Sequence, residues 1–481
     1  MVKSNLLLQA KHRYASTRDI TFVIIAAIIW AAVIVLLNEA PWETRVTTAT
    51  MLAAVFLWVL SPLSLSYTSF MAVLVLVITR VIPLETGLGG FATGSLFLIL
   101  SGLMLAEAIN KTDLAQRTAY FVLGRFGGTP GGALAGLFVI LQILSFLVPS
   151  AAVRITLLLP TVKTIIARSG VPPEDGNLSR MLIIGLAFGA TVTGSGVLPA
   201  ALANIITVDL LTEMTGQRIY YLQWFIYVFP VGVVLAPIMW YILTRTFPPE
   251  LKEFPGGARE FKRALSEMGS LGIREIKCLG VLTLTMVLWV TESVHGLHTA
   301  VPAMLAVVLL GLPVIGIVKW DNMFKINWST IFLVGFTLSL GAAMNSTGTA
   351  TYLADGFFNS LAGGKLSLSP VTAVFAAAVC TQIIHLFMGN VTTVLVAVIP
   401  LVVEIAPRLG VDPLLLGVVT GVSSLYGFLF PVETISNIVV YGTGYLRPLD
   451  MVKPGIYATA ASILILTLTA YIWWPLLGLV R

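Results

Sequence analysis

The chain alternates between long apolar blocks and short polar connections over its whole length. A helix of roughly 20 apolar residues matches the thickness of the hydrocarbon core of a bilayer. The pattern therefore predicts an all-α polytopic membrane protein with about eleven transmembrane helices. The predicted spans lie at 20–38, 47–62, 68–84, 93–109, 180–208, 222–244, 276–294, 300–318, 328–344, 412–440 and 452–477.

Two further apolar blocks, 132–168 and 368–406, are interrupted at their centres. The interruptions read Val148-Pro149-Ser150-Ala151 and Phe387-Met388-Gly389-Asn390, and they place proline or glycine beside polar residues. Two half-length helices that meet at a polar tip are expected to enter and leave the membrane on one side. We therefore predict two re-entrant helical hairpins in addition to the spans.

Composition and charge support this interpretation and add an orientation. Hydrophobic residues make up 57% of the chain and charged residues only 10%, against about 25% charged residues in soluble domains. The net charge of +6 is typical of basic cytoplasmic loops and does not require a nucleic-acid partner. The polar segment 245–277 carries seven Lys and Arg residues, which places it in the cytoplasm together with the N-terminus. Eleven spans then put the C-terminus outside a plasma or inner membrane, and the two hairpins enter from opposite sides.

The same order of parts occurs twice along the chain. Short matches recur 235 or 240 positions later in the sequence: Phe97-Leu98 as Phe332-Leu333, Ser150 as Asn390, and Pro160 as Pro400. Two copies with opposite membrane orientation form an inverted-topology repeat, which is characteristic of alternating-access carriers. The sequence therefore predicts a secondary transporter.

The breaks in the helices predict where a substrate binds. Irregular backbone at membrane depth is tolerated only inside the protein or beside water, so the hairpin tips and the Gly/Pro-interrupted segments 189–204 and 427–437 indicate one central site. Half-helix N-termini at such a site carry partial positive charge and free N–H groups, which suit a small anion. The candidate substrate ligands are Ser150, Arg154, Asn204, Asn390, Thr392, Thr434 and Asn437. The candidate cation-binding or coupling residues are Ser150, Gly196, Asn390, Glu433 and His385.

Two charged residues in apolar segments allow several roles. A charge at mid-membrane costs at least about 2.5–3.5 kcal/mol, so it normally faces a cavity or a partner. Arg154 could bind a substrate carboxylate bidentately, stand as a fixed cation, or pair with Glu433. His385 is either a hydrogen-bonded core residue or a proton carrier. Gln142 and Gln382 occupy repeat-related positions, which favours a shared packing role.

The residues around the second broken span carry a family resemblance that extends over nearly the whole chain. The stretch PVETISNIVVYGTGYLRPLDMVKPG, residues 431–455, resembles the corresponding motif of the divalent-anion:sodium symporter family, and residues 97–117 resemble the span before that family's first hairpin. The resemblance implies a homodimer in which a transport domain moves like an elevator against a scaffold domain. It also implies di- or tricarboxylates or sulfate as substrate, and two sodium ions bound with it at Ser-Asn-Thr hairpin tips and Thr-Pro-Pro-Asn broken spans.

This chain departs from those motifs. The first broken span reads Ala201-Leu202-Ala203-Asn204 and the second reads Thr434-Ile435-Ser436-Asn437, preceded by Glu433. These changes leave open a sodium-independent exchanger, a proton-coupled carrier, or a carrier of sulfate or a sulfonate, with Na⁺ as the only expected coupling metal and no other cofactor. An intramembrane enzyme is disfavoured because the sequence has no HExxH or paired-aspartate motif and no His/Cys cluster. A channel is disfavoured by the resemblance.

The repeat and the resemblance together predict a division of the chain. We expect a cytoplasmic N-terminal segment at 1–19, and scaffold helices of the first repeat at 20–125. The first hairpin and its transport helices are expected at 130–244, followed by the cytoplasmic linker at 245–277. Scaffold helices of the second repeat then occupy 278–360, and the second hairpin with its transport helices occupies 366–481.

Overall fold

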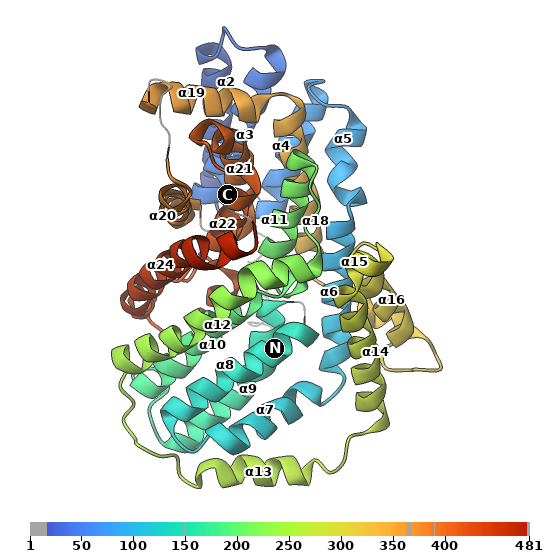
Figure 1. Ribbon diagram of the computed structural model, residues 1–481, viewed down its shortest axis with the longest axis vertical. Coiled ribbons are helices and arrows are strands. Elements are labelled where there is room, and N and C mark those ends of the chain that lie inside the picture. Colours follow the sequence, from blue (N-terminus) through green and yellow to red (C-terminus); the bar gives the residue numbers. More distant parts are fainter. Residues whose placement is uncertain (1–16, 149, 363–367, 389, 479–481) are drawn as a thin grey trace, which may run out of the picture.

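A computed structural model describes residues 17–148, 150–362, 368–388 and 390–478, and these are helical throughout apart from turns and loops (Figure 1). Most of the predicted N-terminal segment 1–19, the tip residues Pro149 and Gly389, and the start of the last predicted segment at 366 lie outside the described residues. Every predicted span and both predicted hairpins coincide with helices, so the all-α membrane fold predicted from hydropathy is confirmed.

The first half of the chain supplies helices up to Thr246. They are α2 (Thr17–Leu36), α3 (Trp42–Leu60), α4 (Leu65–Ile78), α5 (Leu84–Gly89), α6 (Gly94–Asn110), α7 (Leu114–Phe126), α8 (Pro130–Leu147), α9 (Ala151–Ser169), α10 (Asn177–Ser195), the 3₁₀ turn η2 (Leu198–Ala200), α11 (Leu202–Thr215) and α12 (Tyr221–Thr246). The polar linker contains α13 (Gly257–Glu267), which packs against α7.

The second half repeats the order of the first. Its helices are α14 (Ile273–Val290), α15 (Glu292–His295), α16 (Ala300–Gly311), α17 (Trp320–Met323), α18 (Trp328–Ser346), α19 (Thr349–Ala362), α20 (Pro370–Met388), α21 (Val391–Ile405), α22 (Pro413–Leu425), α23 (Ile435–Tyr441) and α24 (Val452–Leu476). Within the described residues, nine helices are long and apolar enough to cross a membrane, or ten if α5 and α6 form one bent span. The helices α4, α16 and α22 are apolar but shorter, so the count of eleven spans stays a prediction.

Local sequence signals account for the breaks. Thr129 caps α8 by accepting a hydrogen bond from the backbone N–H of Gly132, and Pro130 occupies the first turn, where its missing N–H costs nothing. Ser150 and Asn390 cap α9 and α21 in the same way, so each hairpin tip doubles as a helix start. In the broken spans, α10 gives way to η2 and then α11, and α22 gives way to an irregular segment and then α23.

The short helix after each broken span packs against helices of the other half of the chain. The helix α11 of the first half packs against α21 and α22 of the second, and α23 of the second half packs against α9 and α10 of the first. All but one of the residues of α10 from Leu178 onward are buried, as expected of a helix surrounded on every side by other helices. This reciprocal packing brings both hairpin tips and both broken spans to the middle of the molecule, while α2, α3 and α4 pack together at one end (Figure 1).

Candidate functional site

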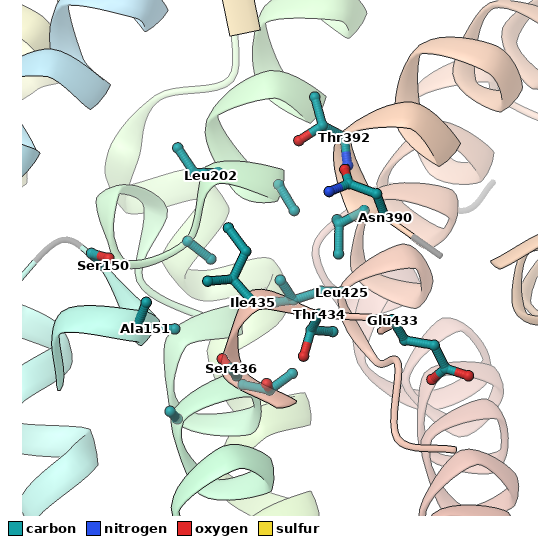
Figure 2. A pocket seen from close by; sticks show the side chains of 16 residues that line it. Ser150, Ala151, Leu202, Asn390, Thr392, Leu425, Glu433, Thr434, Ile435 and Ser436 are labelled. Atoms are coloured by element: carbon teal, nitrogen blue, oxygen red, sulfur yellow. The ribbon is translucent and has the colours of Figure 1, made fainter. Parts of the chain in front are cut away.

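One cavity lies where four helices begin. Its wall contains the capping residue and the first two residues of α9, α11, α21 and α23, so both repeats contribute equally. Figure 2 shows Ser150 and Ala151 on one side of it and Asn390 and Thr392 on the other. The lining residues are Ser150, Ala151, Ala152, Ala190, Thr191, Ala201, Leu202, Ala203, Asn390, Val391, Thr392, Leu425, Glu433, Thr434, Ile435 and Ser436.

The helix starts give the cavity a positive potential. The first N–H groups of a helix have no partner within the helix, and its N-terminus carries about half a positive charge. Ser150, Asn390 and Thr434 each accept one backbone N–H hydrogen bond at their helix starts, whereas Ala201 at the start of α11 has no side chain that can do so. The remaining N–H groups are available to an anion in the cavity.

Glu433 is the only ionisable side chain in the cavity wall among the described residues, and its carboxylate points away from the other labelled side chains (Figure 2). Its Oε2 accepts a hydrogen bond from the backbone N–H of Leu429 at 2.9 Å, and its buried Oε1 has no partner. The carboxylate therefore leaves the centre of the cavity to hydroxyl, amide and backbone N–H groups.

The size of the cavity limits the substrate. Its volume of about 90 Å³ is several times the roughly 10–15 Å³ needed to hold one water molecule, so it can take a few water molecules or one small anion. Aromatic side chains are absent from the wall among the described residues.

The two broken spans are held by the same pair of hydrogen bonds. The Nδ2 atom of Asn204 donates to the carbonyl oxygens of Gly194 and Val197, at 3.0 and 3.1 Å. In the second repeat, Asn437 Nδ2 donates to Gly427 and Phe430, at 3.0 Å each. The acceptors lie ten and seven residues before the asparagine in both repeats. Both asparagines are buried behind the cavity wall and fix the backbone of the break.

Arg154 lies behind the wall as well and is fully buried. Its Nη1 donates to the carbonyl oxygens of Val148 and Ala200, at 3.0 and 3.1 Å, and its Nη2 donates to Ala190 at 2.9 Å. It takes part in none of the ion pairs of the described residues. The predicted alternative of an Arg154–Glu433 pair is therefore not formed, and the guanidinium does not reach into the cavity.

His385 and Gln382 hold the second broken span from α20. The Nε2 atom of His385 lies 3.1 Å from the carbonyl oxygen of Glu433, and Gln382 Nε2 donates to the carbonyl oxygens of Ser423 and Tyr426, at 2.7 and 3.3 Å. A carbonyl only accepts, so Nε2 of His385 carries its hydrogen. The Nδ1 atom of His385 is buried without a partner.

The structure sorts the predicted site residues into two groups. Ser150, Asn390, Thr392, Glu433 and Thr434 line the cavity. The others lie outside the wall: Arg154, Asn204, His385 and Asn437 bond to the backbone of the breaks, and Gly196 packs closely against Phe229 of α12.

The sequence predicted that helix N-termini at the breaks bind an anion, but it did not single out the uncapped start of α11, and it gave no binding role to Gln382. The shared packing role expected for Gln142 and Gln382 is not seen in their contacts, because Gln142 donates to Ser145 on its own helix whereas Gln382 reaches the second broken span.

Comparisons with known proteins place this geometry in context. The family model described as the sodium:sulfate symporter transmembrane region matches residues 14–480. A Cupriavidus necator membrane protein is 27% identical over 399 residues, which cover 82% of this chain and 77% of that protein. The sodium-dependent dicarboxylate transporter SdcS of Staphylococcus saprophyticus is 24% identical over 444 residues, which cover 87% of this chain and 84% of SdcS.

Two solved structures are similar in fold. The Alcanivorax borkumensis YdaH transporter superposes with a TM-score of 0.54 at 15% identity, over 82% of this chain and 89% of that one. Neisseria gonorrhoeae MtrF, described as belonging to a class of antimetabolite efflux pumps, superposes with a TM-score of 0.56 at 12% identity, over 94% and 98%. At these identities the similarity concerns the fold alone.

Proposed function

The chain belongs to the family described as the sodium:sulfate symporter transmembrane region, and on that premise we propose that it carries small organic anions of the dicarboxylate type. As a member it is a multi-pass integral membrane protein and a secondary transporter, not an enzyme. The dicarboxylate class is supported by the relative SdcS, a sodium-dependent dicarboxylate transporter, and the anion preference is supported by the cavity itself.

The observation that carries the proposal is the meeting of four helix N-termini at one cavity. Backbone N–H groups at these helix starts bind carboxylate oxygens without a charged side chain in contact. Ser150, Asn390, Thr392 and Thr434 add hydroxyl and amide groups from both repeats, so each end of a dicarboxylate would meet one repeat. Behind the wall, the guanidinium of Arg154 adds a positive charge, and it donates hydrogen bonds to the carbonyl groups of Ala190 and Ala200.

Sulfate is the second candidate substrate. The family description names sulfate, and a cavity of about 90 Å³ has room for a compact tetrahedral oxyanion. Both ligands use the same N–H groups, so they would compete for one site.

The transport cycle follows from the repeat and the resemblance. Each repeat supplies one hairpin and one broken span to the cavity, so exposure of the cavity alternates when the unit built from these elements moves against the remaining helices. We propose an elevator movement in a homodimer, in a plasma or inner membrane, with the N-terminus cytoplasmic and the C-terminus outside.

The proposal is tested by uptake of labelled succinate and labelled sulfate into proteoliposomes preloaded with the same unlabelled anion. We expect saturable uptake of succinate that sulfate inhibits competitively. In Ser150→Ala, loss of a hydrogen bond to a charged ligand is expected to raise the KM about tenfold.

Ser64→Ala is the matched control, because Ser64 also caps a helix, α4, but lies away from the cavity wall. It is expected to keep the KM of the unmodified protein. Equal effects of the two substitutions, or no uptake of either anion, would contradict the proposed site.

A further inference from the structure

The two repeats hold a matching pair of backbone carbonyls beside the cavity. Ala190 and Ala200 lie fourteen and four residues before Asn204, and Ser423 and Glu433 lie fourteen and four residues before Asn437. Counted from the asparagines, which make the same two backbone hydrogen bonds, these carbonyls have equivalent sequence positions in the two broken spans.

Side chains of the hairpins donate to both carbonyls in each repeat. In the first repeat Arg154 donates to Ala190 and Ala200, at 2.9 and 3.1 Å. In the second repeat Gln382 donates to Ser423 at 2.7 Å and His385 donates to Glu433 at 3.1 Å. The donors come from different helices of the two hairpins, α9 and α20, yet they reach the same positions.

A repeat-related glycine makes room for Arg154 in the first repeat and for His385 in the second. A Cβ atom at Gly194 would come within 2.5 Å of Nη2 of Arg154. A Cβ atom at Gly427, its counterpart ten residues before Asn437, would come within 2.7 Å of Cε1 of His385. The close fit shows that the donors are built into the breaks of both spans.

Carbonyls exposed at a broken membrane helix are the usual ligands of a coupling sodium ion in inverted-repeat transporters. The relative SdcS is named as sodium-dependent, so a sodium ion is the expected occupant of these places. In this chain N–H groups already point at the carbonyls, and in the first repeat they belong to a permanently charged guanidinium. A sodium ion would meet both the hydrogens and the positive charge, so these two places do not fit the ion.

We propose that Arg154 in the first repeat, and Gln382 with His385 in the second, permanently occupy the places of coupling cations, so that the carrier works without Na⁺ as an anion exchanger. This inference rests on the proposed function for its transport consequence but not for its ion-binding consequence. A bound anion in the cavity offsets the charge of Arg154, whereas in the empty carrier the only carboxylate of the described cavity wall is that of Glu433, which makes no ion pair with Arg154. Return of the empty carrier is therefore disfavoured, and exchange of one anion for another is favoured.

The alternative to this proposal is that Na⁺ binds elsewhere, at buried oxygen atoms that lack a hydrogen-bond partner. Oε1 of Glu433, Oδ1 of Asn437 and Oδ1 of Asn204 are buried without hydrogen-bond partners among the described residues. A sodium ion held by these atoms would restore the coupling expected from the relatives. The experiment must therefore detect Na⁺ binding anywhere in the protein and not only beside Arg154.

The first measurement is the thermal unfolding temperature of the purified protein in NaCl and in KCl at equal ionic strength, without substrate. An ion that binds the folded protein raises this temperature in proportion to the logarithm of its concentration above Kd. We expect no difference between the two salts for the unmodified protein. A rise specific to Na⁺ overturns the proposal, whatever the substrate is.

The same measurement on Arg154→Ala tests directly whether the guanidinium keeps Na⁺ away from the three carbonyls to which it donates. Removal of the guanidinium leaves the carbonyls of Val148, Ala190 and Ala200 around a space without a donor. We expect this variant to gain a stabilisation by Na⁺ over K⁺, and to be stabilised by added guanidinium ion at low millimolar concentration. Arg168→Ala, on the same helix but paired with Glu260 at the surface, is the control and should show neither effect.

The transport arm measures exchange of labelled for unlabelled succinate in proteoliposomes with Na⁺ or with choline as the only cation. We expect equal exchange rates in Na⁺ and in choline. We also expect an uptake rate at least tenfold lower in vesicles without internal anion. Exchange that falls tenfold without Na⁺ overturns this inference and leaves the proposed function standing. Absence of exchange with succinate and sulfate alike overturns the proposed function, while the salt comparison still decides whether Na⁺ binds.

Discussion

At the scale of single residues, Arg154 illustrates how a buried charge is kept in a membrane protein without a counter-ion. Its guanidinium is fully buried, and its bonds go to three backbone carbonyls. One of these carbonyls belongs to Ala190, five residues before the end of α10, and another belongs to Ala200 at the end of η2, and both carbonyl oxygens face the guanidinium. The negative ends of these carbonyl dipoles stabilise the guanidinium as a carboxylate would. Because carbonyl groups carry no net charge, the positive charge of Arg154 is not neutralised and can attract an anion in the cavity.

The closeness of Gly194 to this guanidinium gives a prediction at the same scale. In Gly194→Ala the added Cβ would lie within 2.5 Å of Nη2, so the guanidinium must shift away from Ala190. We expect unfolding to become easier by about 1–3 kcal/mol, as for other overpacked positions. Transport should fall at least tenfold, measured as exchange in proteoliposomes.

Gly280→Ala is the control, because a Cβ at Gly280 on α14 has nothing within 4 Å. Alanine in a helix interior is favoured over glycine by roughly 0.5–1 kcal/mol, so this variant should be slightly more stable and fully active. A Gly194→Ala protein that resembles it would contradict the tight fit of Arg154.

At the scale of elements, the helix starts around the cavity differ in one respect. Thr434 caps α23, and the equivalent residue in the first repeat, Ala201, cannot cap α11. The N–H of Asn204 in α11 bonds to the carbonyl oxygen of Ala201 at 3.2 Å, whereas the N–H of Asn437 in α23 bonds to the hydroxyl of Thr434 at 3.1 Å. Both helix starts therefore leave the N–H groups of their first two residues to the substrate, and the second repeat adds the hydroxyl of Thr434 to the cavity wall.

A capping side chain at the start of α11 is expected to raise the stability of the protein while weakening its binding of the anion. In Ala201→Ser the hydroxyl can accept a hydrogen bond from the free backbone N–H of Ala203 at the start of α11, and such a cap typically contributes about 1 kcal/mol to stability. The same bond competes with the anion, so the KM should rise several-fold while the unfolding temperature rises.

Thr434→Ala is the reciprocal variant in the second repeat and should lower the unfolding temperature. If Ala201→Ser raised stability and left the KM unchanged, the N–H groups of α11 would not be substrate ligands.

At the scale of the whole molecule, an ion pair joins the segments predicted to move against each other. Nη2 of Arg218, in the loop before α12, lies 2.5 Å from Oε1 of Glu292 on α15. The other oxygen of Glu292 accepts the backbone N–H of Tyr221 at the start of α12, so the carboxylate ties both the loop and the helix. Glu292 is 4% exposed and Arg218 is 34% exposed, so the pair is only partly screened by water.

If α12 moves relative to α14 and α15 during transport, Arg218→Gln should ease that movement. We expect a loss of about 1–2 kcal/mol of stability, limited by the partial exposure of Arg218, together with a higher maximal exchange rate and an unchanged KM. Arg263→Gln removes the exposed Arg263–Glu267 pair on α13 and should change neither quantity. A lower maximal rate in Arg218→Gln would show that the pair supports movement instead of restraining it.

The sequence predicted the elements well because membrane helices are specified locally. Apolar length fixes where a helix crosses, and the prolines, glycines and caps near Ser150 and Asn390 fix where it breaks. The repeat in the sequence also predicted that both tips and both broken spans form one site, and Ser150, Asn390, Thr392, Glu433 and Thr434 do line one cavity. The number of membrane crossings was less well determined, because apolar helices as short as α16 do not show by length whether they cross.

What only the tertiary structure decided is which polar groups face the cavity and which face the backbone. Arg154, Asn204, His385 and Asn437 all suit ligand roles by residue type, yet their donors are taken up by carbonyls of the breaks. The carbonyls to which Arg154 donates in α10 and η2 lie 36 and 46 residues away along the chain, and those of Gln382 and His385 lie 41 and 48 residues away. Such contacts depend on how helices pack, whereas hydropathy and helix breaks depend only on neighbouring residues, and so the sequence alone determined the membrane fold but not the occupants of its carbonyl sites.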